Sequence, residues 1–143
     1  MSFKVYDPDQ VKAIICGIPI TGGWAEDSMI EIQQKADNFV TVAGVGGDVT
    51  RSKVLDKRAT IKIKLLQSSD ENALLSALAN LDANASNGAG VGPSGISDKG
   101  GTALFAGAKS WIARPPDVEF AATAKERVWL IEVAEIERFD GGN

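Results

Sequence analysis

The stretch from residue 58 to residue 83 constrains the fold more than any other part of the chain. Between Ala59 and Leu65 apolar and polar residues alternate, and this period of two predicts a strand with one buried face. Leucines then recur at helical spacing, at Leu74, Leu75, Leu78 and Leu81. We therefore expect a long strand followed by one amphipathic helix at about residues 69–83. No other segment has comparable helical periodicity, so the remainder should be sheet or loop.

The start of this helix is predicted by a capping box. Ser68 is followed three residues later by Glu71, the spacing at which a hydroxyl caps the first turn and a carboxylate reaches back to the cap.

The remaining segments predict a mainly β protein. Gly17 to Gly23 reads as a turn, because its glycines and Pro19 suit turns better than strand interiors. Strands are expected at residues 10–16, 28–34, 39–42, 102–113 and 126–139. Together with the strand before the helix, they predict an antiparallel β-barrel or sandwich of six or seven strands, with one flanking α-helix.

At 143 residues the chain is long enough for one domain with its own core, so we expect a single domain over residues 1–143. Residues 43–57 have low apolar periodicity and are predicted to form a protruding arm. Residues 84–101 are rich in Gly, Ser and Asn, which predicts an exposed, flexible loop.

Charge is unevenly distributed along the chain. Residues 48–64 hold six basic and two acidic side chains, a net charge of +4, and the remaining 9 basic and 17 acidic side chains leave a net charge of −8. One interpretation is an ordinary solvated hairpin. The other is a basic limb that docks on the acidic face of a second copy of the chain.

Composition excludes several kinds of catalytic and metal site. The chain has no histidine and one cysteine. This composition excludes Ser-His-Asp and Cys-His catalysis, histidine metal sites and cysteine-rich zinc sites. Cys16 lies in an apolar run and is expected to be a buried, inert thiol. Residues 90–95 fit G-x-G-x-x-G, but they follow the helix instead of preceding one, so dinucleotide binding is not predicted. We expect no enzyme activity and no cofactor.

The N-terminal residues lack the basic and apolar regions of a signal peptide, and no apolar run reaches the length of a membrane span. These patterns favour a soluble chain made in a cytoplasm. The overall net charge of −4 argues against a nucleic-acid binder.

Several short strings, in the same order and over nearly the whole chain, resemble the tail tube proteins of contractile-tailed bacteriophages. They are PITG at 19–22, GGDVTRS at 46–52, LLQSS at 65–69, LLSAL at 74–78, WI at 111–112, PPDVEF at 115–120 and GGN at 141–143. The segment after Gly22 and the loop at 84–101 have no counterpart in this resemblance.

The resemblance implies a tail-tube-like β-barrel, similar to the secreted ring protein of type VI secretion. It further implies homohexameric rings stacked into the inner tube of a virion tail, the conduit for genome ejection, assembled in the host cytoplasm. The implied partners are other copies of the chain and the tail sheath, tape-measure, baseplate and tail-terminator proteins. DNA would pass through the tube without specific binding, and the chain itself would not insert into a membrane.

Two sets of residues are candidates for roles in such a tube. Inter-subunit contacts are expected from the arm and the basic residues after it, at Val49, Arg51, Lys53, Lys57 and Arg58. An acidic bore would repel DNA phosphates, and the candidate bore-facing residues are Glu31, Glu132, Glu135 and Glu137. Glu135 and Glu137 could in principle do acid–base chemistry, but a solvated pair on a strand is the simpler interpretation. The alternative function is a soluble β-barrel module that binds a small ligand in its mouth.

Overall fold

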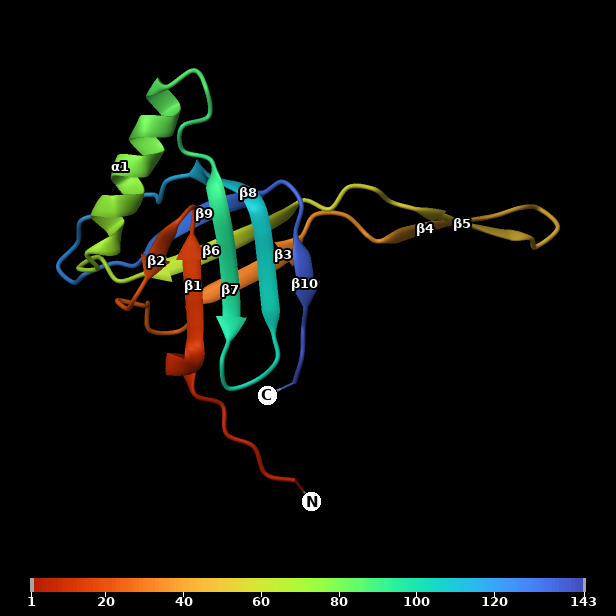
Figure 1. Cartoon of the computed structure of the whole chain (residues 1–143), viewed down its shortest axis with the longest axis horizontal. Helices are drawn as coiled ribbons and strands as arrows, with labels where there is room; N and C mark the ends of the chain where they lie inside the picture. Colours follow the sequence, from red (N-terminus) through yellow and green to blue (C-terminus); the bar gives the residue numbers. More distant parts are fainter. Residues whose placement is uncertain (1, 143) are drawn as a thin grey trace.

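The computed structural model describes residues 2–142, in which one coiled antiparallel sheet of eight strands carries a helix at one end and a hairpin at the other (Figure 1). Strand order in the sheet is β2-β1-β7-β8-β9-β6-β3, and β10 also pairs with β8. The elements are η1 (Pro8–Gln10), β1 (Val11–Ile15), β2 (Ile18–Ile20), β3 (Ile30–Gln34), β4 (Phe39–Ala43), β5 (Val49–Lys53), β6 (Ala59–Leu65), α1 (Glu71–Asn84), β7 (Gly92–Asp98), β8 (Leu104–Arg114), β9 (Arg127–Val133) and β10 (Glu137–Phe139). The expected class, mainly β and antiparallel with one flanking helix, is confirmed.

The core lies inside the coil of the sheet, where β1 and β7 cross β3 and β6 (Figure 1). The predicted alternation of β6 is confirmed, because every second residue from Ala59 to Leu65 is buried. Its central neighbour β9 alternates in the same way, with Trp129, Ile131 and Val133 inside. Burial of this many large apolar side chains is the main favourable contribution to folding.

The structure has ten strands within residues 2–142, more than the six or seven expected. One of the additional strands, β7, lies within residues 84–101, so the expectation of a flexible loop over that whole range is wrong. Ser94 and Ile96 are buried there, and the glycines let the strand pack closely. At Gly92, for example, an added Cβ would lie 2.9 Å from the carbonyl oxygen of Cys16.

Two more strands, β2 and β10, lie in segments for which the sequence predicted a turn and a single long strand. The turn expected at 17–23 is shorter, because Cys16 and Gly17, both with positive φ, reverse the chain and β2 follows at once. The single strand expected at 126–139 is interrupted after Val133. There the Ala134 amide bonds the Lys109 carbonyl, and the Ile136 amide bonds the Lys57 carbonyl.

Helix α1 begins two residues later than expected, and the predicted capping box does not form. Its N-cap is Asp70, whose side chain makes no capping hydrogen bond. Glu71 instead accepts hydrogen bonds from the backbone amide and hydroxyl of Thr21, at 3.2 and 2.7 Å, and from the Ser69 hydroxyl at 2.8 Å. Tertiary contact with the segment after β2 has replaced the local motif.

The predicted leucine stripe of α1 is only partly buried. Leu75 is fully buried, whereas Leu74 and Leu81 are each 54% exposed. The helix lies along the end of the sheet and contacts mainly β2 and β8, so one leucine and the smaller Ala79 suffice to dock it (Figure 1). Its first turn is fixed by Asn72, whose side-chain oxygen accepts the indole N–H of Trp129 at 2.9 Å.

Candidate assembly surface

Strands β4 and β5 form a separate two-stranded hairpin that leaves the body between β3 and β6, and we call this hairpin the arm (Figure 1). The sequence predicted that the protruding segment begins at residue 43, but it begins earlier, at Phe39. The short strand predicted at residues 39–42 lies on the arm as β4, so its apolar residues Phe39, Val40 and Val42 are outside the body. All ten residues of β4 and β5 are exposed. A two-stranded hairpin is marginally stable alone in water, so this exposure is an unusual feature.

The arm is well formed despite its exposure. Five residue pairs connect its strands, from Phe39 opposite Lys53 to Ala43 opposite Val49. The turn is closed by the Gly44 amide, which donates to the Asp48 carbonyl at 2.7 Å, and Gly47 supplies the positive φ. The arm thus presents a defined shape to its surroundings.

Three of the candidate contact residues lie together on the arm. Val49, Arg51 and Lys53 alternate along β5 and so share one face of the hairpin. The Arg51 guanidinium stacks over the Phe39 ring, 4.1 Å from its centroid, while Val49 is 67% exposed. This face combines two cations with exposed apolar surface, a composition suited to protein contacts.

The other two contact candidates, Lys57 and Arg58, lie where the arm meets the body, and we call this region the arm root. Arg58 binds both carboxylate oxygens of Asp56 at 2.9 Å. These hydrogen bonds lower the pKa of Asp56 from 3.8 to about 2. Lys57 pairs more loosely with Glu135, at 3.8 Å. Both basic residues thus have acidic partners within their own chain.

Glu132 completes the arm root. Its Oε1 accepts a hydrogen bond from the Lys35 ammonium at 2.6 Å, and the Arg58 guanidinium lies 4.0 Å away. The Glu132 side chain is only 19% exposed, so this pair is better shielded from water than the other ion pairs of the arm root. Glu132 therefore joins β9 to both stems of the arm, because Lys35 follows β3 and Arg58 precedes β6.

The four candidate bore-facing acids occupy two places. Glu31 and Glu132 lie on the outer face of β3, β6 and β9, where Glu31 pairs with Lys64 at 3.5 Å and sits opposite Lys62. Glu135 lies in the link between β9 and β10, and Glu137 is the first residue of β10. Glu31, Glu132 and Glu135 each form an ion pair with a basic side chain, so the four acids do not form one continuous acidic surface.

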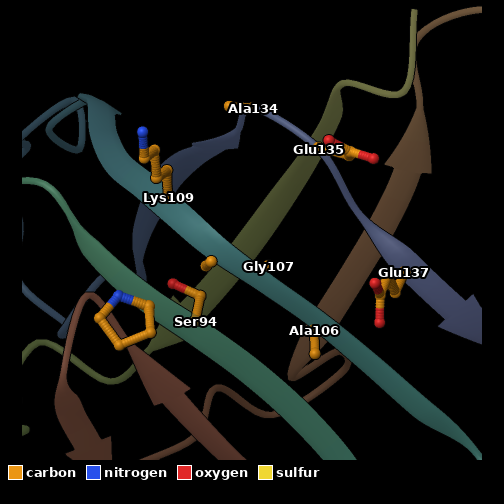
Figure 2. A pocket seen from close by; sticks show the side chains of 9 residues that line it. Ser94, Ala106, Gly107, Lys109, Ala134, Glu135 and Glu137 are labelled. Atoms are coloured by element: carbon orange, nitrogen blue, oxygen red, sulfur yellow. The ribbon is translucent and has the colours of Figure 1, made fainter. Parts of the chain in front are cut away.

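An open groove of about 630 Å³ crosses the middle of β8, and we call it the β8 groove (Figure 2). Small residues form most of its lining, with charges at the rim. It is lined by Pro93, Ser94, Ala106, Gly107, Ala108, Lys109, Ala134, Glu135 and Glu137. Figure 2 shows Glu135 and Glu137 on the side of β10 and Ser94 on the side of β7.

Cys16 lies beside the β8 groove, in contact with the buried hydroxyl groups of Ser94 and Ser110. Its backbone amide donates to the Ser94 hydroxyl at 3.0 Å, and its thiol lies 3.7 Å from the Ser110 hydroxyl. Burial raises the pKa of the Cys16 thiol, which disfavours the reactive thiolate. The expectation of an inert thiol agrees with this geometry, although the residue is partly exposed.

Within residues 2–142 no group of three or more acidic or cysteine side chains is placed to hold a metal ion. In the same part of the chain no helix combines the length and apolar character needed to cross a membrane.

Sequence reasoning missed two residues of this surface, Lys35 and Phe39. Lys35 and Arg58 are 23 residues apart in the sequence, so no local pattern indicated that both lie near Glu132. β3 and β6 pair in an antiparallel register that places Lys35 next to Arg58, and the Lys35 amide bonds the Arg58 carbonyl. Knowledge of this register would have predicted that the two residues are neighbours.

Comparison with known proteins identifies the kind of molecule that carries this surface. A structural protein, ORF10, of Pseudomonas phage KPP10 is 29% identical over 145 residues, covering 98% of this chain and 84% of the relative. The cryo-EM structure of the anti-feeding prophage cap, a tube terminating cap, matches with a TM-score of 0.61 over 97% of this chain and 93% of the cap chain; at 6% identity it shows a shared fold. The family model for the bacteriophage PhiTE tail tube protein matches residues 15–141. The chain therefore belongs to this bacteriophage tail tube protein family.

Proposed function

We propose that the chain assembles into homohexameric rings that stack into the inner tube of a contractile tail, through which the genome is ejected. The observation that carries the proposal is the arm, a hairpin whose ten strand residues are all exposed. A hairpin of this kind gains stability when another surface covers it, and in a tube of stacked rings that surface would belong to another copy of the chain.

The charge distribution supports contacts between different surfaces of neighbouring copies. Arg51 and Lys53 on the arm make no ion pair among the described residues, whereas the body carries most of the acidic side chains. Contacts between two unlike patches generate rings or open helical assemblies, which are the components of a tube.

In this proposal the role of the chain is structural, without catalysis. The tube would lie in the virion tail, be assembled in the host cytoplasm, and contact the sheath, tape-measure, baseplate and tail-terminator proteins. DNA would slide through without specific binding. The assignment of Glu31, Glu132, Glu135 and Glu137 to the bore stays a prediction.

A ligand-binding barrel is the weaker alternative. The interior of the coiled sheet is filled by large side chains such as Trp129, Ile131 and Leu65. The β8 groove is open to solvent, whereas small-ligand sites usually enclose most of the ligand.

The test is electron microscopy of the purified chain across a concentration series, with and without isolated baseplates as seeds. Hollow tubes with six-fold rings are expected. A chain that stays monomeric at every concentration, even with seeds present, would contradict the proposal.

A further inference from the structure

The β8 groove lies on the body close to the arm root, because Glu135 at its rim pairs with Lys57 and the Ile136 amide bonds the Lys57 carbonyl. The arm of the same chain extends away from the body, past β10 and away from β8 (Figure 1). A chain therefore cannot place its own arm in its own groove. Any arm in this groove must come from another copy.

The groove and the arm match in shape. The groove is lined by alanine and glycine backbone at Ala106, Gly107, Ala108 and Ala134, which leaves space that larger side chains elsewhere on a sheet would fill. On the face that carries Arg51 and Lys53, the arm also presents Val49, which is 67% exposed, and the turn adds Val45, which is fully exposed. Apolar side chains of this size entering a small-residue groove would bury surface that neither partner covers alone.

The groove and the arm also match in charge. Glu137 at the groove rim has no ion pair among the described residues, and neither do Arg51 and Lys53 on the arm. The rim has one cation, Lys109, against the two carboxylates of Glu135 and Glu137. An unpaired acid in the groove and unpaired bases on the arm are complementary, and such pairs favour one docking register over others.

We propose that the β8 groove is the receptor for the arm of a second copy of this chain. The proposal rests on the assembly proposed above and adds the surface on which the arm lands. Each copy then donates its arm to the next copy and accepts one at a groove beside its own arm root. Because donor and acceptor surfaces differ, the contact repeats head to tail.

Two single-defect variants separate donor from acceptor. In the armless variant, residues 39–53 are replaced by Asn-Gly; the Val54 amide already bonds the Asn38 carbonyl at 2.9 Å, so a two-residue turn can join them. In the groove-blocked variant, Ala108→Trp fills the groove from an exposed position. Ala121→Trp, the same enlargement on an exposed loop outside the groove, is the control. Circular dichroism and thermal unfolding establish that each variant folds.

Each single-defect variant should raise the concentration needed for assembly at least about tenfold, while Ala121→Trp assembles like wild type. Mixed in equal amounts, the armless and groove-blocked variants should form a 1:1 complex by sedimentation. The armless chain keeps a free groove, and the groove-blocked chain keeps a free arm.

The result that overturns the receptor assignment is wild-type-like assembly of Ala108→Trp, or a mixture that forms no 1:1 complex. If the wild type itself does not assemble, the proposed function fails instead, so the two failures are distinguishable.

Charge reversal gives a second readout that does not depend on filling the groove. Glu137→Arg should weaken the 1:1 complex about tenfold or more, and Arg51→Glu with Lys53→Glu in the arm donor should restore it. Failure of the reversed arm to restore binding would contradict the pairing of these charges.

Discussion

Glu132 shows how one residue connects the body to the arm. Its carboxylate meets Lys35 at 2.6 Å and Arg58 at 4.0 Å, so it fixes both stems of the hairpin to β9. Sequence patterns placed Glu132 among the candidates for an acidic bore, and that role stays untested. Its contacts indicate that it also sets the direction in which the arm projects.

Replacing Glu132 should loosen the arm root without unfolding the body. Glu132→Gln removes the charge that holds Lys35 and should cost about 1 kcal/mol, because the pair is only partly exposed. Hydrogen exchange should become faster at the amides of Lys35 and Val54, which close the two stems. Glu31→Gln is the matched control, since Glu31 pairs with Lys64 on the same face but away from the arm. Equal effects of the two substitutions would contradict a specific role for Glu132.

Glu71 joins the segment after β2 to the start of α1. Hydrogen bonds from Thr21, and secondarily from Ser69, lower its pKa. A carboxyl whose folded pKa is lowered contributes stability above its ordinary pKa and loses it as the pH falls through the folded value.

Glu71→Gln should therefore destabilise the protein at neutral pH, by about 0.5 kcal/mol because the carboxylate lies near the surface, where water screens its interactions. The difference from wild type should shrink in acid, as the pH falls below the ordinary pKa of a glutamate and through the lowered pKa of Glu71 in the folded protein. Urea unfolding of both proteins at neutral and acidic pH measures this. A difference that grows in acid would show that the sign is wrong.

Gly107 lies on β8, where this strand packs against Val133 at the end of β9 and the link that follows. A Cβ at this position would collide with the Val133 side chain and lie 3.2 Å from the carbonyl oxygen of Glu135. Gly107→Ala should destabilise the fold by about 1–3 kcal/mol, because neither the core side chain nor the backbone has room to move. Gly95→Ala is the control, with its nearest atom at 3.9 Å, and should leave the unfolding midpoint nearly unchanged. Thermal unfolding that ranks the two variants equally would contradict this account.

Among the elements, the arm is independent of the core. The core cluster contains no residue of β4 or β5, and the arm pairs only with itself. The armless variant with Asn-Gly between Asn38 and Val54 should therefore unfold within about 0.5 kcal/mol of wild type. A large loss of stability in this monomer would mean that the arm supports the body.

The same elements show what could be predicted from sequence. Strand β6 and helix α1 were predicted because their long periodic patterns are local. Strand β7 was not, because glycine and serine dominate it and only its neighbours β1 and β8 make it a strand. The four-residue run Phe39 to Val42 indicated a strand correctly but not its place on an exposed hairpin, since exposure depends on the whole fold.

The assembly surface was predicted less completely than the fold. The arm residues Val49, Arg51 and Lys53 were singled out by charge and by resemblance, and they share one face. The partners of Glu132 and the β8 groove depend on contacts between segments far apart in the sequence. Such contacts follow from strand register and from the break after Val133, neither of which a single sequence specifies.

At the scale of the whole molecule, the body has a filled interior, while the arm and the β8 groove remain uncovered. A stable domain that leaves these two surfaces open is suited to repeated head-to-tail contacts with its own copies. Membership of a tail tube protein family agrees with this use of the fold.

The most direct test is a cryo-EM reconstruction of the particles formed by the purified chain. We expect a hollow tube of stacked six-fold rings, in which each arm is covered by a neighbouring copy. A reconstruction in which the arms project free into solvent, or in which the chains form a closed particle without a bore, would contradict the account.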